Sequence, residues 1–112
     1  MKSFGEILVA EDHPIILTLY TKALHKHGFA HHSANSPQSA LEIMRRKDIK
    51  HLLTDGNGWN EVIQEGIKLN CSVVIQTGEV WSHRHHGVPV IEKTQGVIFV
   101  IDNFLRISGL IQ

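Results

Sequence analysis

The sequence is poor in cysteine, in net charge and in long apolar runs, and each absence excludes a class of protein. Its single cysteine, Cys71, allows neither an internal disulfide nor a cysteine-based zinc site, which suits a reducing cytoplasm. Eleven basic residues balance eleven acidic ones, so the chain lacks the positive field that direct nucleic-acid binding needs. No apolar run approaches the length of a membrane span. The 112 residues predict one cytoplasmic domain, residues 1–112, with no membrane or nucleic-acid partner.

What is present is an alternation of short apolar runs with helical periodicity. Five runs fit β-strands: 6–10, 30–34, 51–55, 72–77 and 88–93. Between and after them lie helix signals: Pro14 in a first turn, the Ser36–Pro37 cap, a start near Asn60, and stops at Gly28 and Gly109. Strand–helix alternation of this kind predicts an α/β fold with a parallel sheet that is covered on both faces.

The first and last expected helices each carry an apolar stripe. In the first, residues four apart form the expected buried face: Ile15, Ile16, Leu19, Tyr20, Ala23 and Leu24. In the last, the expected buried face consists of Val97, Ile98, Ile101, Phe104 and Leu105. Both helices are therefore expected to pack on the sheet.

The segment between Thr77 and Val88, "GEVWSHRHHG", departs from the alternation. It is too short and too rich in glycine and histidine for a normal crossover helix, so the fourth helix is predicted to be shortened or absent. Its histidines, His83, His85 and His86, fit an exposed loop better than a metal site, because Glu79 is the only carboxylate close to them in sequence.

Polar residues stand where the expected strands end. Glu11 and Asp12 follow the first strand, and Asp55, Thr77 and Lys93 end the third, fourth and fifth. In open α/β sheets, ligands bind at this edge, where the strand order reverses. If the order is 2-1-3-4-5, three carboxylates meet in one pocket, and adjacent like charges there call for a cation. Mg²⁺, which prefers hard oxygen ligands, is the expected ion.

Such a pocket suits phosphoryl transfer. Asp55 would be the nucleophile and would carry the phosphoryl group as an acyl phosphate. Mg²⁺ would neutralise its charge, and the Lys93 ammonium would act on it as a point charge. The Thr77 hydroxyl would move toward the new phosphate oxygens. The alternative is that Asp12 and Asp55 are only turn residues at strand ends.

Trp59 and Trp81 fall in loops beside the pocket and could cover it, although core packing is the default interpretation.

The blocks "ILVAEDHP", "HLLTD", "VVIQTGE" and "VIEK", in this order over nearly the whole chain, resemble the receiver domain of bacterial two-component response regulators. The resemblance implies a flavodoxin-like (βα)5 fold and phosphotransfer from a histidine kinase or phosphotransfer protein to Asp55. It also implies a set of Mg²⁺ ligands: Glu11, Asp12, Asp55 and the main-chain carbonyl of Asn57. Thr77 and Lys93 would be the switch pair. Enzymatic activity would be at most autophosphotransfer and autodephosphorylation at Asp55.

The chain also departs from the receiver pattern. "DGNGWN" replaces the apolar residue and Met-Pro turn that usually follow the phosphorylated aspartate, Thr94 replaces the proline after Lys93, and Val90 replaces the switch aromatic. The leading hypothesis is a stand-alone receiver domain with an unknown downstream protein target. The alternative is a pseudo-receiver, which binds a partner without phosphorylation. A flavodoxin-type or dehalogenase-type enzyme ranks third, because "EDHPII" is no phosphate loop and Asn57 stands where a dehalogenase needs a second aspartate.

In receiver domains the fourth helix, fifth strand and fifth helix form the output surface. With the fourth helix reduced, the resemblance implies an altered output face and a possible homodimer through the final helix. An exposed strip around Phe99, Val100 and Phe104 would support that homodimer.

Overall fold

The computed structural model describes residues 6–78, 84–85 and 87–112. The strands are β1 (Glu6–Ala10), β2 (His32–Ala34), β3 (Ile49–Asp55), β4 (Ser72–Thr77), β5 (Arg84–His85) and β6 (Val88–Glu92). The helices are α1 (Pro14–Lys26), α2 (Pro37–Arg46), α3 (Asn60–Lys68), the 3-10 helix η1 (Lys93–Gln95) and α4 (Val97–Ile107). None of the helices within the described ranges is long and apolar enough to cross a membrane.

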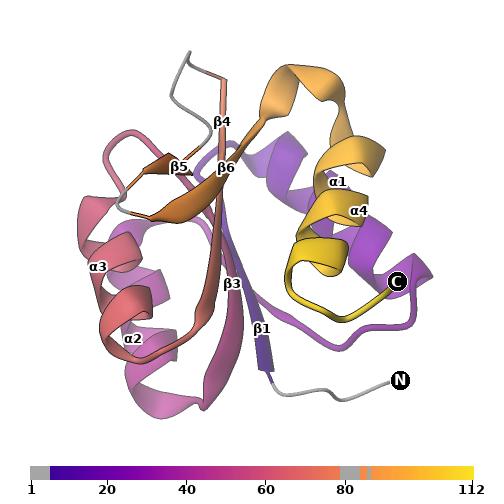
Figure 1. Ribbon diagram of the computed structural model, residues 1–112. Helices are drawn as coiled ribbons and strands as arrows, with labels where there is room; N and C mark the ends of the chain where they lie inside the picture. The colour runs from indigo at the N-terminus through magenta and orange to yellow at the C-terminus, as the bar shows by residue number, and fades with distance from the viewer. Residues whose placement is uncertain (1–5, 79–83, 86) are drawn as a thin grey trace.

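Five parallel strands form the centre of the molecule, in the order β2-β1-β3-β4-β6. Helices α1 and α4 cover one face of this sheet and α2 and α3 cover the other, which gives three layers (Figure 1). Because β6 is the fifth of the parallel strands, this is the expected order 2-1-3-4-5. The flavodoxin-like fold predicted from the sequence is therefore confirmed.

Local signals set the helix boundaries as the sequence predicts. Helix α1 begins at Pro14, and α2 begins after Ser36, whose Oγ accepts a hydrogen bond from the Ser39 N–H at 3.2 Å. Gly28 follows α1 with a φ of 85°, in the left-handed region that glycine adopts without strain. The chain therefore turns back at defined points, and β1 and β3 end at the same edge of the sheet.

Alternating strand side chains build one apolar core on each face of the sheet. Leu8, Leu52 and Ile75 pack on the α2–α3 side, and Val9, Leu53 and Val74 pack on the α1–α4 side; all six are fully buried. Trp59 is 2% exposed and belongs to the α2–α3 core, so core packing is the correct interpretation for this residue. The same alternation, continued to the strand ends, places Glu11 and Gln76 on the α1–α4 side.

The apolar stripe of α1 differs from the prediction. Tyr20 and Leu24 are buried as expected, but Ile15 and Leu19 are 66% and 43% exposed. The helix turns the row of Ile16, Tyr20 and Leu24 toward the sheet, and the neighbouring row faces outward. The prediction that Ile15 and Leu19 are buried is therefore wrong.

The stripe of α4 also differs from the prediction. Val100, Ile101, Phe104 and Leu105, spaced by three and four residues, are fully buried. Ile98 lies off this row and is 74% exposed, so its predicted burial is wrong. The exposed strip predicted for a homodimer is wrong as well, because only Phe99 of its three members is exposed. The homodimer through the final helix stays a prediction, without the support of this strip.

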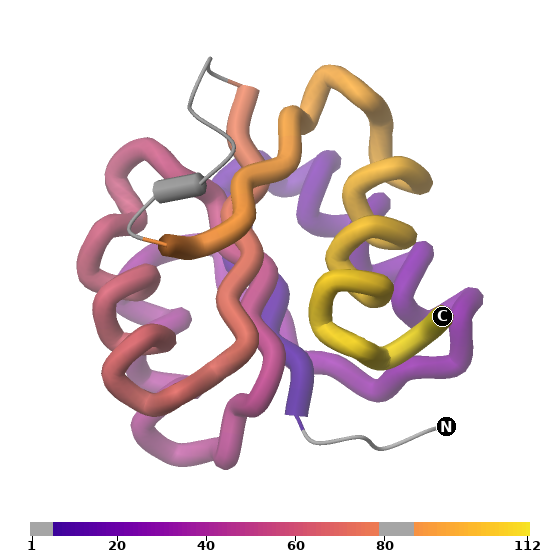
Figure 2. Tube along the Cα trace, viewed as in Figure 1, coloured from indigo at the N-terminus to yellow at the C-terminus, as the bar shows by residue number. Residues whose placement is uncertain are grey.

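No helix occurs among the described residues that connect β4 to β6, which are 78, 84–85 and 87. Strand β5 instead pairs antiparallel with the start of β6, and Gly87, which directly precedes β6, has a φ of 78° (Figure 1). Figure 2 shows the Cα trace continuing from β6 into α4. Strand β5 thus occupies part of the segment in which a shortened or absent helix was predicted, and β5 itself was not predicted. The predictions for Glu79, Trp81, His83 and His86 lie outside the described residues, and His85 is described only as part of β5.

Candidate acidic site at the sheet edge

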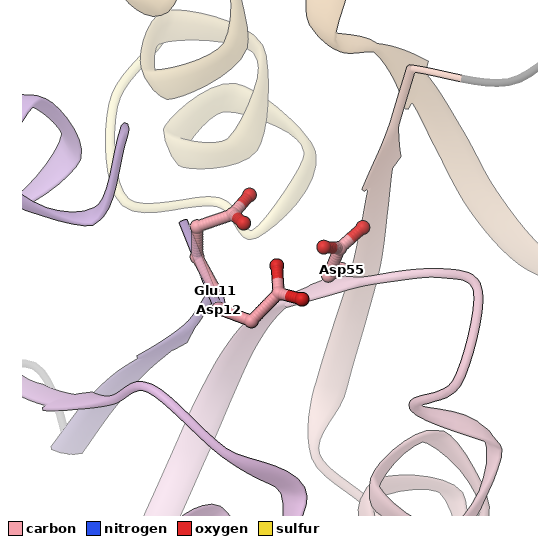
Figure 3. Close-up of side chains that lie close together, drawn as sticks. All are labelled: Glu11, Asp12 and Asp55. Carbon is pink, nitrogen blue, oxygen red and sulfur yellow. The ribbon is translucent and has the colours of Figure 1, made fainter. Parts of the chain in front are cut away.

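The carboxyl groups of Glu11, Asp12 and Asp55 lie together where β1 and β3 end. The register pairs Ala10 with Thr54, so the residues that follow them emerge side by side. One carboxylate oxygen from each of the three acids lies within 4.8 Å of the others, and the groups face one shared space (Figure 3). Glu11 is fully buried, Asp55 is 9% exposed and Asp12 is exposed. The structure thus brings together the three acids that the sequence placed at strand ends.

Lys93 joins this acidic group from η1, directly after β6. Its Nζ lies 2.7 Å from Glu11 Oε1 and 3.2 Å from Asp55 Oδ2, and its side chain is 19% exposed. The other oxygen of Asp55, Oδ1, accepts a hydrogen bond from the Gly56 N–H at 2.8 Å. A single, largely buried ammonium therefore serves two buried carboxylates.

Two residues that the sequence did not single out complete the arrangement. Gln76, the penultimate residue of β4, is fully buried and donates from Nε2 to Glu11 Oε1 at 3.0 Å. The Tyr20 hydroxyl donates to Gln76 Oε1 at 3.0 Å. A glutamine inside the apolar strand "SVVIQT" is the signal that could have identified Gln76. Tyr20 carries no such signal, because an aromatic residue on a helix face indicates only core packing.

The shared ammonium affects the two buried carboxylates differently. Burial raises the pKa of Asp55 to about 6, and the charge of Glu11 adds to this effect, while Gly56 and Lys93 act against it. Burial also acts to raise the pKa of Glu11, but hydrogen bonds, first among them that of Lys93, lower this pKa below 4.5 overall. The larger number of hydrogen bonds that Glu11 accepts, from Lys93, the His13 main chain and Gln76, accounts for the difference. Glu11 is therefore the ionised partner of Lys93, and Asp55 carries the charge that is poorly compensated.

Lys93 is held in its charged form by the same contacts. Burial acts to lower the pKa of its ammonium, but the two carboxylates outweigh this effect and raise the pKa above 10.5. Lys93 therefore places a positive charge beside the three carboxylates at neutral pH.

The remaining predicted site residues, Thr77 and Asn57, lie at the same edge of the sheet. Thr77 ends β4, is 2% exposed, and pairs in register with Glu92, the residue before Lys93. Asn57 is exposed, two residues after Asp55, in the turn that leads to α3. Their expected roles, a hydroxyl donor and a main-chain metal ligand, stay predictions.

The chain matches no protein-family model and no curated protein sequence. It does resemble solved structures. The orphan response regulator HP1043 of H. pylori has a TM-score of 0.81 at 10% identity, over 96% of this chain and 98% of that chain. A response regulator receiver protein from Sinorhizobium medicae has a TM-score of 0.74 at 22% identity, over 93% and 96%. A de novo designed Rossmann 2x3 fold protein has a TM-score of 0.76 at 16% identity, over 92% and 90%.

These likenesses define a fold. The chain has the fold of response regulator receiver domains, which is the resemblance that its sequence blocks indicate. The designed protein shares this architecture, so the fold by itself assigns no activity. What this particular chain does has to be argued from the side chains at its sheet edge.

Proposed function

We propose that the chain is a phosphoacceptor receiver domain of a two-component phosphorelay, phosphorylated on Asp55 by a histidine kinase or phosphotransfer protein. The observation that carries the proposal is the pairing of Asp55 with Lys93 at 3.2 Å, beside two further carboxylates. An aspartate that only ended a strand would need neither a buried ammonium nor a second buried acid that shares it.

The residues of the site suit a divalent cation such as Mg²⁺. Three carboxylates and one ammonium have a net charge of about −2, which a divalent cation would neutralise. Mg²⁺ binds oxygens at about 2.0–2.1 Å, so its ligand atoms lie about 3–4 Å apart, close to the 4.8 Å within which the carboxylate oxygens already gather. In the proposal, Glu11, Asp12, Asp55 and the main-chain carbonyl of Asn57 would hold the ion.

When bound, the ion would neutralise negative charge on a phosphoryl group next to Asp55. A carboxylate oxygen of Asp55 attacks the phosphorus of a phosphohistidine, and the new O–P bond forms as the P–N bond breaks. The imidazole leaves and takes a proton from solvent. Lys93 presents its charge to the phosphoryl oxygens, and the Thr77 hydroxyl offers a donor to the acyl phosphate. Phosphorylation then shifts the population between two existing arrangements that a downstream target distinguishes.

Intact mass after incubation with acetyl phosphate and Mg²⁺ tests this proposal. The wild-type chain should gain about 80 Da, the mass of one phosphoryl group, and Asp55→Asn should gain nothing. Asp48→Asn is the matched control, because Asp48 is 80% exposed just before β3 and should leave the reaction unchanged. Chelation of the metal should abolish the adduct. An adduct in Asp55→Asn, or none in the wild type, would refute the assignment.

A second candidate function is a pseudo-receiver that binds a protein partner without phosphorylation. Two features favour it: strand β5 lies within the connection between β4 and β6, and Val90 stands where receivers have the switch aromatic. Calorimetric titration with Mg²⁺ separates the two candidates. A phosphoacceptor should bind the ion, and Asp12→Asn should weaken binding at least tenfold, whereas a pseudo-receiver should bind none at millimolar concentration.

A further inference from the structure

A chain of hydrogen bonds runs from α1 to the acidic site through Tyr20 and Gln76, which have no part in the proposed reaction. Both side chains are buried, with 1% and 0% exposed. The Tyr20 hydroxyl donates to Gln76 Oε1, and Gln76 Nε2 donates to Glu11 Oε1, each at 3.0 Å. Burying polar groups costs free energy unless they are paired, and these two hydrogen bonds pair Tyr20 and Gln76 inside the core.

Donor and acceptor chemistry permits only one direction for these hydrogen bonds. The ionised Glu11 carboxylate can only accept, so Gln76 must turn its amide NH₂ toward it. The amide oxygen then faces Tyr20, whose hydroxyl must donate. A reversed Gln76 would place its oxygen against the carboxylate. Glu11 therefore determines which way the Gln76 amide faces, and the Tyr20 hydroxyl supplies the donor that holds the amide in this position.

The fixed carboxylate of Glu11 acts on Lys93. Its Oε1 accepts from Gln76 and from Lys93 Nζ at 2.7 Å, while Oε2 accepts from the His13 main-chain N–H at 2.9 Å. With both oxygens held, the carboxylate cannot turn to follow a moving lysine. The Lys93 ammonium is consequently kept 3.2 Å from Asp55 Oδ2.

We propose that Gln76, held in place by the Tyr20 hydroxyl, is a positioning residue that acts through Glu11 to hold the Lys93 ammonium at Asp55. The core alone gives no reason for a glutamine here. The neighbours of Gln76 on this face of the sheet are apolar and belong to one buried cluster. They are Val74, two residues earlier on β4, and Ile91, the register partner of Gln76 on β6. An apolar side chain at position 76 would fill the space without the desolvation that a buried amide requires. For phosphotransfer the inference rests on the proposed function, but for the placement of Lys93 it does not.

The test uses Gln76→Met, which keeps the side-chain volume, and Tyr20→Phe, which removes one hydroxyl. Ile75→Val is the matched control, because Ile75 is the neighbour of Gln76 on β4 but packs in the opposite core. The first measurement is the rate of reductive methylation of Lys93 by formaldehyde and cyanoborohydride, followed by peptide mass spectrometry. We expect labelling about fivefold faster in Gln76→Met, about twofold faster in Tyr20→Phe, and unchanged in Ile75→Val.

The second measurement is the phosphorylation rate as a function of acetyl phosphate concentration. At saturating donor, Gln76→Met should be about tenfold slower, with the half-saturating concentration unchanged, because only the placement of Lys93 is lost. A structural role alone would not separate these two constants. The Tyr20→Phe effect should also vanish in the Gln76→Met background, since both act along one chain of hydrogen bonds.

The two measurements fail in different ways. Wild-type protein that is never phosphorylated would refute the proposed function, while faster Lys93 labelling in Gln76→Met would still support the positioning of the lysine. Labelling at the wild-type rate in folded Gln76→Met overturns the inference, whatever the phosphorylation rate. If labelling is faster but the phosphorylation rate is that of the wild type, the claim that Gln76 affects the reaction is refuted.

Discussion

Replacing Asp55 by asparagine should stabilise the metal-free protein, although the proposed activity depends on this residue. Burial and the neighbouring Glu11 raise the pKa of Asp55 from 3.8 to about 6, and only 12% of its side chain is exposed. The folded state therefore holds the proton of Asp55 more tightly than the unfolded state does. Stability consequently falls as the pH rises from about 4 through about 6. At about 1.36 kcal/mol per pH unit, ionised Asp55 destabilises the fold by about 3 kcal/mol at pH 8.

Asparagine removes this charge without emptying the site. It has nearly the same size, and its amide oxygen can accept the hydrogen bond that Gly56 N–H donates to Asp55. Lys93 keeps its shorter contact with Glu11. We therefore expect Asp55→Asn to be more stable than the wild type by about 3 kcal/mol at pH 8, with a melting temperature about 10 °C higher. Below pH 4 the two proteins should be equally stable.

Urea unfolding followed by circular dichroism, with a chelator at pH 4, 6 and 8, measures this difference. Asp48→Asn, at an exposed position, should stay within about 0.5 kcal/mol of the wild type. Mg²⁺ in excess should stabilise the wild type and not Asp55→Asn, because the ion favours the ionised carboxylate. A variant no more stable than the wild type at pH 8, or a gain of equal size at pH 4, would refute the reasoning.

Three further substitutions test other parts of the structure. Lys93→Met should destabilise the protein by about 3–5 kcal/mol at pH 8, because buried Glu11 loses its counter-charge; urea unfolding should show a smaller loss at lower pH, because without Lys93 the pKa of Glu11 rises and the carboxylate takes up a proton more readily. Gly66→Ala should cost about 1–3 kcal/mol in thermal unfolding although alanine favours helices, since its Cβ would lie 2.8 Å from Val73 Cγ2; unchanged stability would mean that the core yields. Ser36→Ala should cost about 1 kcal/mol through the lost cap of α2, and a loss too small for urea unfolding to detect would contradict this assignment.

Most of the fold could be predicted because apolar periodicity reports burial directly. The runs 6–10 and 72–77 have the bounds of β1 and β4, since compact apolar segments flanked by polar residues fit strands buried on both faces. Strand β5 could not be predicted, because it depends on the turn at Gly87 and on pairing with β6 rather than on its own residues. Its existence is a consequence of tertiary structure.

The helix faces show where periodicity is insufficient. Both α1 and α4 carry more apolar residues than one buried face requires, so two adjacent rows compete for the sheet. On α4, the row of Val100 and Phe104 is buried and Ile98 is left exposed. Only the packing of α4 against α1 and the strands decides between such rows, and the sequence contains no record of that packing.

The acids of the site could be predicted, but the residues that hold them could not. Parallel strands end at a common edge, so Asp12 and Asp55 follow from strand positions alone. The link from Gln76 to Glu11 joins β4 to the end of β1 across β3, and Tyr20 enters from a helix. Such contacts depend on three elements being in place at once. A sequence pattern describes one element at a time, so the glutamine in "SVVIQT" marks Gln76 as unusual but does not indicate what it contacts.

The balance of charges at the sheet edge bears on why the site exists. Folding gains nothing from placing a second buried carboxylate beside an ammonium that Glu11 already neutralises, and the raised pKa of Asp55 indicates that the fold is strained by its charge. Neutral side chains at the ends of β1 and β3 would serve the sheet as well or better. A cationic ligand that binds the ionised carboxylate would offset this cost by stabilising the folded state. If a cation offsets this charge, Mg²⁺ in excess should stabilise the wild type by at least as much as Asp55→Asn stabilises the metal-free protein at pH 8. A smaller gain at saturating Mg²⁺ would mean that the ion is not what the acids are for.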